Sequence, residues 1–428
     1  MTSKSMRNYS NLSTMNFEIS RKQEHFLKKV DDICKLIRPY EEECYLKERF
    51  NKRIISEFSK IGMLGCPISK KYGGLGYDIL TYALAIERLG EEGNSLRTFF
   101  SAHISIGQMV LEGWGNQEQQ KRYLPYTSTG KSIMAFALTE PTAGSDPSSL
   151  ATTYEDRGDH FVINGKKHWI GNGTIADLMT TYAKESGSIN SNKNISAFII
   201  DTDSQGIYIK EMKNKIGMLT VKNAEISFHN CIVPKKNLLG QKGQGLNIAY
   251  SALIDGRLSV AAGAIGVMVD CLHESTSHAK SRVQHGSFLA KKQLIQRHIA
   301  KIILNIESSR WLVYRAAFIR QKLHNYVEEL KTKDDHWQLK LTRNNKEYSV
   351  LRAEADNLSA IAKFSASNAA FDTSNIAVQI FGSFAYRKTN RVARHFLDSR
   401  AITVYEGANE VLELKIASHV LGERYRAY

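Results

Sequence analysis

The 428-residue sequence has few of the features that mark secreted, metal-binding or membrane-spanning proteins. Its five cysteines are scattered, odd in number and form no Cys-x-x-Cys pair, which argues against disulfides or a zinc site and favours reduced thiols. Because a His-Glu-x-x-His motif is also missing, we expect no metal. No apolar run approaches the ~20 residues of a membrane span, and the N-terminus lacks an apolar signal region. We therefore expect a cytoplasmic protein with no membrane span.

Glycine motifs that bind nucleotides are lacking as well. No Gly-x-Gly-x-x-Gly follows an N-terminal strand, so a Rossmann site is not predicted. The stretch GQKGQG at 240–245 resembles a glycine loop, but it lacks the Lys-Ser/Thr ending of a phosphate loop. We interpret it as a turn between a strand and a helix.

The charge is strongly unbalanced, with a formal net charge of +15. Such a balance can indicate nucleic acid, but the Lys and Arg residues are spread along the chain without interleaved aromatic residues. We therefore expect no nucleic-acid binding. An acidic partner or a polyphosphorylated cofactor is the alternative, and charge alone does not choose between these explanations.

The length favours two or three domains, and the sequence texture changes twice. After an expected flexible tail at 1–16, residues 17–131 show helical periodicity. Residues 132–245 contain short β-rich segments, typical of a barrel or sandwich of seven or eight strands. Long periodic helices fill 246–428, apart from a charged stretch at about 326–349, expected to be an exposed insertion. The fold class is therefore mainly α with a central β domain.

One carboxylate stands out near the C-terminus, where Glu406 lies between Tyr405 and Gly407 and just before a helical pattern from Glu406 to Leu421. An acid at this place can simply be a helix N-terminal residue, favoured by the helix dipole and by unpaired N–H groups. It can also be a catalytic base. The rest of the sequence has to decide.

Five stretches resemble the acyl-CoA dehydrogenase family, and they occur in that family's order. They are FALTEPTAGSDPSSLATT (136–153), NGKKHWIGNGTIADL (164–178), SRVQHGSFLAKKQLIQ (281–296), QIFG (379–382) and YEGANE (405–410). The resemblance implies an N-terminal helical domain, a middle β-barrel and a C-terminal four-helix bundle. It also implies FAD, held partly by a neighbouring subunit in a homotetramer or homodimer.

Carried over by motif, the resemblance assigns the cofactor contacts. Trp169 would cover the flavin ring, although it could be a plain barrel-core aromatic, and Arg282 would bind phosphate, although it could be a solvated helix-end charge. The implied cofactor-binding residues are Phe136, Leu138, Thr139, Gly144, Ser145, Trp169, Ile170, Gly171, Arg282, His285, Gln293, Gln379, Gly382, Ser383, Ala408 and Glu410.

The resemblance also gives Glu406 a role, since breaking a Cα–H bond beside a thioester needs a base. Glu406 would take the α-proton while a hydride leaves the β-carbon for flavin N5. The substrate would be an acyl thioester on CoA or on an acyl carrier protein. An electron-transferring flavoprotein or another acceptor would reoxidise the flavin. The implied substrate-binding residues are Arg97, Ser145, Arg257, Tyr405 and Gly407.

Several positions depart from the family pattern. Gly171 replaces a Ser or Thr whose hydroxyl meets the flavin edge, and His285 replaces an aromatic residue near the adenine. Ser383 and Ala408 replace a Gly and a Thr. Each change weakens one cofactor contact, but the base remains.

The substrate end of the sequence suggests a polar acyl group. The stretch NSLRTFFSAHISIG (94–107) resembles the glutaryl-CoA dehydrogenase branch and the acyl-carrier-protein dehydrogenases of polyketide and hybrid peptide pathways. Arg97 would meet a polar acyl end, or else it is a surface residue at a helix N-terminus.

Two rival functions remain. One is a flavin monooxygenase or oxidase on the same fold, which Gly171 favours and Glu406 opposes. The other is a non-catalytic binding protein, suggested only by the charge.

Overall fold

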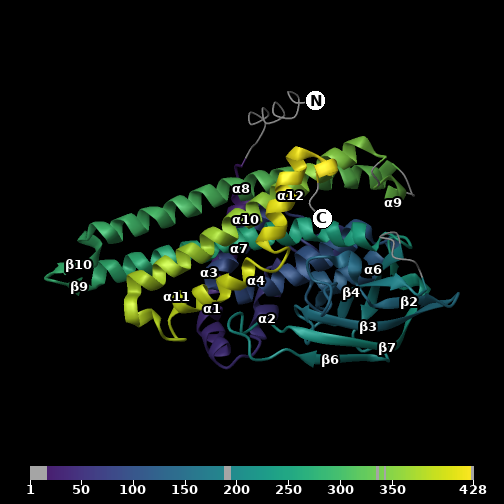
Figure 1. Cartoon of the computed structure of the whole chain (residues 1–428), viewed down its shortest axis with the longest axis horizontal. Coiled ribbons are helices and arrows are strands. Elements are labelled where there is room, and N and C mark those ends of the chain that lie inside the picture. Colours follow the sequence, from purple (N-terminus) through teal and green to yellow (C-terminus); the bar gives the residue numbers. More distant parts are fainter. Residues whose placement is uncertain (1–16, 188–193, 334–336, 342–343, 426–428) are drawn as a thin grey trace.

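The computed structural model describes residues 17–187, 194–333, 337–341 and 344–425, so the expected tail at 1–16 lies outside the described residues. Helices come first, a β domain follows, and helices return (Figure 1). This order confirms the predicted fold class, mainly α with a central β domain.

The N-terminal part is helical because its apolar residues recur at helical spacing. The first helix begins at a capping box, in which Ser20 and Gln23 exchange side-chain and backbone hydrogen bonds. Its apolar stripe, including Phe26, Val30 and Ile37, is buried in the main core. The helices are α1 (Arg21–Leu46), α2 (Arg53–Lys60), α3 (Ile79–Glu92), α4 (Asn94–Phe100), α5 (Met109–Trp114) and α6 (Gln117–Ser128).

A π-helical stretch, Ser101–Gln108, separates α4 from α5. The sequence FFSAHISIGQMVLEGWG (99–115) predicts one buried helix that Gly113 and Gly115 close, and periodicity alone does not reveal the wider turns. Polar side chains support the stretch, since Ser105 pairs with Tyr82 at 2.7 Å and His103 accepts from the Met134 N–H at 3.1 Å. Such stretches are frequent at functional sites, and this one borders the cavity described below.

The β domain is an eight-stranded sheet in the order β6-β7-β3-β2-β4-β5-β8, with β1 added parallel to β4. Alternating apolar residues, such as Phe161, Ile163 and Phe228, form a second core between the strands. The strands are β1 (Met134–Ala137), β2 (Thr153–Asp156), β3 (His160–Ile170), β4 (Leu178–Glu185), β5 (Ile195–Asp201), β6 (Ile207–Glu211), β7 (Ala224–Pro234) and β8 (Leu238–Leu239).

Three long helices lie side by side in the C-terminal part (Figure 1). The most apolar of them, α7, is long enough to cross a membrane, but 94% of its apolar window is buried inside the protein, so it is a core helix. The elements are α7 (Gly245–Ser281), β9 (Val283–Gln284), β10 (Ser287–Phe288), α8 (Gln293–Lys333), α9 (Trp337–Lys340), α10 (Lys346–Phe381), α11 (Arg391–Ile402) and α12 (Asn409–Leu421).

The charged stretch at 326–349 differs in part from the expected exposed insertion. Helix α8 continues through it to Lys333, and Trp337, Leu341 and Tyr348 are buried. The Lys331 ammonium donates to the Glu112 carbonyl at 2.7 Å, which fastens the stretch to α5. Too few apolar residues occur here to show a period, so the sequence did not reveal this packing.

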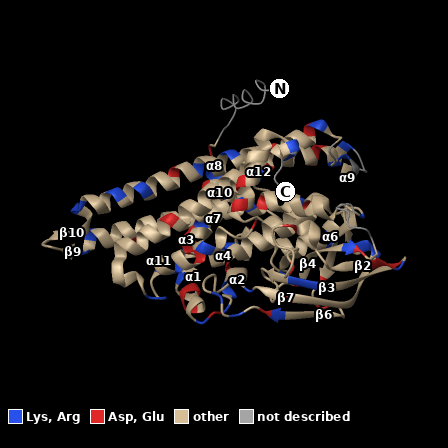
Figure 2. Ribbon diagram, in the orientation of Figure 1, with Lys and Arg blue, Asp and Glu red and all other residues tan. Residues whose placement is uncertain are grey.

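Polar contacts bind the three parts of the chain together. Asp398 on α11 accepts hydrogen bonds from Tyr45 and Ser95 of the N-terminal helices, at 2.8 and 2.9 Å, and from the Met218 N–H of the β domain. Figure 2 shows Lys and Arg residues distributed over α8, the α9 region and the sheet. The parts are therefore joined by specific pairs as well as by apolar packing.

Candidate active site

A cavity of about 1930 Å³ lies where the three parts of the chain meet, and we call it the central cavity. The N-terminal helices contribute Arg97 and the π-helical stretch, while the β domain contributes the loop after β1 and the end of β3. The C-terminal part contributes Arg257 of α7 and Glu406. Of the predicted site residues, those that line the cavity are Arg97, Phe136, Leu138, Thr139, Gly144, Ser145, Trp169, Ile170, Gly171, Arg257, Tyr405, Glu406, Gly407 and Ala408.

The loop 138–152 is held in place by a buried ion pair. The Lys167 ammonium lies 2.7 Å from Glu140 Oε1, and both side chains are almost completely buried. Lys167 also donates to the Leu138 carbonyl at 3.2 Å, and Glu140 accepts from the N–H groups of Ala151 and Thr152. Sequence reasoning missed this pair, although both residues stand in the quoted motifs, because nothing in the local sequence shows that the two charges meet.

Trp169 is directed into the cavity by a break in β3. The pairing of β3 with β7 shifts between Lys167 and Ile170, and Trp169 has a left-handed backbone with φ +58°. A bulge re-aims a side chain in this way. The residue is 53% exposed, so Trp169 is not the plain core aromatic of the alternative interpretation.

Gly171 leaves open space at the cavity wall. A Cβ built on Gly171 would meet only Ala102 of the π-helical stretch, at 3.7 Å. A serine would therefore fit there sterically. The glycine supplies no hydroxyl, as the sequence indicated.

Glu406 lies on a left-handed turn ahead of α12. Its φ is +56° and that of Gly407 is +91°, and α12 begins only at Asn409. The predicted start of the helix at Glu406 is therefore wrong, because these two residues have no helical backbone. The interpretation of Glu406 as a helix N-terminal acid fails for the same reason.

The turn at Glu406 is fixed by cationic side chains. Arg257 donates from Nε to the Glu406 carbonyl at 3.1 Å and forms an ion pair with Asp356 at 2.7 Å. The Lys363 ammonium donates to the Gly407 carbonyl at 2.7 Å. The backbone of the turn is therefore held on both sides, which compensates a conformation that a non-glycine residue adopts at a cost.

The environment of the Glu406 carboxyl group raises its pKa and so favours the protonated form. Its Oε2 atom is shielded from solvent and has no hydrogen-bond partner among the described residues. Burial raises the pKa of Glu406 to about 7, while the positive charges of Arg257, Arg97 and Lys363 act in the opposite direction. The carboxylate packs on Gly256, where an added Cβ would come within 2.4 Å of Oε2. Such a group can exchange a proton at neutral pH.

Arg97 is a buried cation that faces the same cavity. It is fully buried, which excludes the alternative that it is a surface residue. Its Nη2 donates to the Tyr405 hydroxyl, whereas Nε and Nη1 have no hydrogen-bond partner among the described residues. Gly263 of α7 makes room for it, since a Cβ there would lie 2.7 Å from Arg97 Cδ. Unpaired buried donors are costly, so they point to an acceptor in the cavity.

A second group of predicted residues lies away from the central cavity. These positions gather around the β9–β10 hairpin and the adjoining ends of α7, α8 and α10 (Figure 1). Arg282 lies over the Phe384 ring at 5.4 Å and is exposed. The members of the group are Arg282, His285, Gln293, Gln379, Gly382 and Ser383. Glu410, on the exposed side of α12, does not line the cavity either.

The residues of the central cavity fit a flavin. The exposed face of Trp169 can cover a planar ring, and the loop 138–152 brings backbone donors and acceptors to the wall beside it. The orphaned Glu406 oxygen and the unpaired Arg97 donors supply polar groups facing the remaining space. The fold and this site together define the class of a flavoenzyme, with a buried carboxylate, Glu406, in its cavity.

Family comparisons agree with that class. The models of the acyl-CoA dehydrogenase N-terminal, middle and C-terminal domains match residues 20–131, 135–231, and 243–330 with 342–421. The chain belongs to the acyl-CoA dehydrogenase family, whose members are oxidoreductases acting on CH–CH bonds, and its cofactor is FAD. The C-terminal match skips residues 331–341, within the charged stretch.

Two curated relatives illustrate the similarity. A short-chain specific acyl-CoA dehydrogenase of Clostridium acetobutylicum is 33% identical over 95% of this chain and 100% of its own length. A caffeyl-CoA reductase-Etf complex subunit of Acetobacterium woodii is 32% identical over 87% of this chain and 90% of its own.

Three solved structures are similar over almost the whole chain. An acyl-CoA dehydrogenase of Bacillus anthracis complexed with FAD has a TM-score of 0.86 and 28% identity, covering 96% of this chain and 68% of that one. The prolyl acyl carrier protein oxidase AnaB has a TM-score of 0.82 and 30% identity, covering 94% and 99%. A glutaryl-coenzyme A dehydrogenase complex has a TM-score of 0.84 and 26% identity, covering 97% and 98%.

Proposed function

We propose that this protein is an FAD-dependent dehydrogenase of a short, polar acyl thioester, with Glu406 as the base that removes the α-proton. One observation carries the proposal. The Glu406 carboxylate, with an unpaired oxygen and a pKa raised by burial to about 7, faces a cavity that also exposes Trp169 and the loop 138–152.

The chain's own groups divide the work. Glu406 accepts the proton from the carbon beside the thioester carbonyl, and its backbone N–H donates a hydrogen bond to the developing enolate oxygen. Arg257 and Lys363 hold the turn that presents the carboxylate. Bound FAD supplies the acceptor for the two electrons released from the substrate.

Replacing the base tests this function directly. In the Glu406→Gln variant the amide nearly matches the carboxylate in shape but cannot accept the proton. We expect the purified variant to keep FAD and to lose flavin reduction by substrate by at least about 100-fold. Anaerobic mixing with a panel of acyl-CoA and acyl-carrier thioesters, followed by flavin absorbance, makes the measurement. Bleaching at the wild-type rate would remove Glu406 from this role.

The polar nature of the acyl group is proposed from Arg97. Its two unpaired donors can bind a carboxylate or hydroxyl at the end of a short acyl chain. A plain apolar chain would leave these donors buried and unsatisfied, which costs free energy. The similarity to a glutaryl-coenzyme A dehydrogenase structure supports the same proposal.

The carrier and the electron acceptor belong to the proposal too. The net charge of +15 suits an acidic acyl carrier protein, and AnaB is named as an oxidase of a carrier-bound group. An electron-transferring flavoprotein is the proposed acceptor, since one relative is a subunit of a reductase-Etf complex.

Gly171 favours a second candidate, an oxidase, because it leaves space and no hydroxyl at the cavity wall. The rate of flavin reoxidation by dioxygen, compared with that by the flavoprotein, separates the two candidates.

Assembly and localisation stay predictions. We propose a homotetramer or homodimer in which the group around Arg282 and Gln379 contacts the FAD of a neighbouring subunit, because these exposed residues lie away from the central cavity. A cytoplasmic location and a biosynthetic role in polyketide or hybrid peptide pathways stand on the sequence resemblance. Light scattering together with the FAD content tests the assembly.

A further inference from the structure

We propose that Lys363 is a positioning residue for Glu406: it holds the turn that presents the carboxylate and places a positive charge near it. The proposal rests on the proposed role of Glu406 as the base. Lys363 lies on α10, is fully buried and is not among the residues that line the central cavity. It therefore acts through the turn and not by touching the substrate.

The contacts of Lys363 show how it holds the turn. Its ammonium donates to the Gly407 carbonyl at 2.7 Å and to Asn409 Oδ1 at 2.8 Å. Asn409, the first residue of α12, also donates to Ser367 at 3.0 Å, one helical turn along α10 from Lys363. The side chain thus links the left-handed turn at Glu406 and Gly407 to a rigid helix.

The charge of Lys363 has no structural explanation in its own contacts. It forms no ion pair with a carboxylate of the described part of the chain, and both of its acceptors are neutral oxygens. Burying an ammonium group without a counter-ion is costly, whereas a methionine would fill similar space without that cost. Burial lowers the pKa of Lys363 to about 7, and the nearby charge of Glu406 opposes that shift. The positive charge of Lys363 favours the ionised form of the Glu406 carboxylate.

The other charges around the pair come from four helices. Arg97 and Arg257 add positive charge near Glu406, and Asp356 neutralises part of it through its ion pairs. The groups facing the Glu406–Lys363 pair are Arg97 on α4, Arg257 on α7, Asp356 on α10, and Glu410 and Lys415 on α12. Lys363 is the one cation among them that both bonds the turn directly and lacks a carboxylate partner among the described residues.

Two substitutions separate the two contributions. Lys363→Gln keeps a donor for the Gly407 carbonyl and loses the charge, whereas Lys363→Met loses both. In the FAD-loaded enzyme, we expect both variants to move the acidic limb of the flavin-reduction pH profile upward by about one unit, because a carboxylate ionises less readily without a neighbouring cation. The infrared carboxylate band of Glu406, assigned by difference from Glu406→Gln, should titrate with the same shift. Lys363→Met should in addition reduce the maximal rate.

The control is Lys301→Gln, which removes an exposed lysine paired with Asp372 and should change neither readout. An unshifted pH limb and an unshifted infrared titration in folded Lys363 variants would overturn the electrostatic role. Should those variants not fold, Asn409→Ala keeps the charge and removes one anchor. It should slow reduction several-fold without moving the limb, and a wild-type rate would overturn the positioning role. Flavin reduction that persists in Glu406→Gln would instead defeat the proposed function itself.

Discussion

At the scale of single residues, the site is a buried carboxylate among three cationic side chains. Burial and the positive charges of Arg97, Arg257 and Lys363 act on Glu406 in opposite directions, and the balance brings its pKa to about 7. A carboxylate with an ordinary pKa would be a weaker base, and a fully neutralised one would not be ionised at all. Each cation therefore influences how readily Glu406 takes a proton, as well as any ligand it binds.

Arg97 provides the residue-scale prediction of specificity. Arg97→Met removes the guanidinium and keeps an unbranched apolar side chain in its place. We expect kcat/KM for the polar thioester to fall about 10- to 100-fold while FAD stays bound, because a charged hydrogen bond is worth about 1.5–3 kcal/mol. The ratio of kcat/KM for polar against butyryl substrates, measured for both proteins, is the readout. An unchanged ratio would leave the acyl group of this substrate unassigned.

At the scale of structural elements, two irregular stretches shape the cavity. The π-helical stretch Ser101–Gln108 lies against one wall, and the loop 138–152 with the bulge at Trp169 forms another. Buried polar side-chain contacts support both stretches. The Glu140–Lys167 pair is the main anchor of the loop.

The loop anchor gives a stability prediction. Lys167→Met leaves the Glu140 carboxylate buried without its cation, so we expect a loss of about 3–5 kcal/mol in the free energy of unfolding and weaker FAD binding. The double variant Glu140→Gln with Lys167→Met should recover part of that loss. The neighbouring Lys166→Met, which breaks an exposed pair with Glu225, should cost less than about 1 kcal/mol. Urea unfolding and FAD titration measure these effects, and equal midpoints for the two single variants would refute the anchor.

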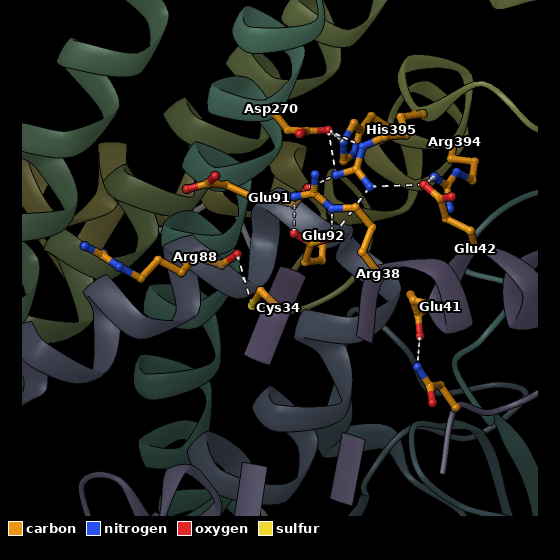
Figure 3. Close-up of polar contacts among 12 residues, drawn as sticks. Cys34, Arg38, Glu41, Glu42, Arg88, Glu91, Glu92, Asp270, Arg394 and His395 are labelled. Carbon is orange, nitrogen blue, oxygen red and sulfur yellow. Dashed lines mark hydrogen bonds and ion pairs between the residues drawn. The ribbon is translucent and has the colours of Figure 1, made fainter. Parts of the chain in front are cut away.

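At the scale of the whole molecule, buried ion pairs join helices distant in sequence. Asp270 of α7 accepts from His395 of α11 at 2.7 Å and pairs with Arg391 at 3.0 Å. Figure 3 shows this group continuing to Arg38 and Glu92, which come from α1 and α3. The N-terminal helices and the C-terminal bundle therefore share one charged network.

This network predicts how stability depends on pH. Although burial acts to raise it, His395 and Arg391 hold the pKa of Asp270 well below its ordinary value. A lowered pKa means that the stabilisation is complete above about pH 4 and is lost as pH falls further. We expect Asp270→Asn to lower the free energy of unfolding at pH 7 by about 3 kcal/mol or more. The difference from wild type should shrink below about pH 4.

The control for Asp270 is Asp372→Asn, in an exposed pair with Lys301 that should contribute less than about 1 kcal/mol. Chemical unfolding at several pH values measures both variants. A constant difference between wild type and Asp270→Asn across the acid range would contradict the predicted linkage.

The sequence by itself determined the order of the parts, the family and the cofactor. Helical periodicity predicted the helical parts before and after the β domain, and short β-rich segments predicted that domain, because apolar spacing is a local property of each segment. The motifs around Thr139, Trp169 and Glu406 predicted the cofactor and the family, since these residue types recur together for one chemistry.

Only the tertiary structure decided what surrounds those residues. The sequence allowed Arg97 to be a surface residue or a pocket residue, and its complete burial excludes the surface. Folding also brings Lys363 to the Gly407 carbonyl, 44 positions away in the sequence. The left-handed backbone at Glu406 and the π-helical stretch have no local pattern that announces them. Charge, strain and desolvation at the site arise from contacts between distant segments, so they exist only once the chain has folded.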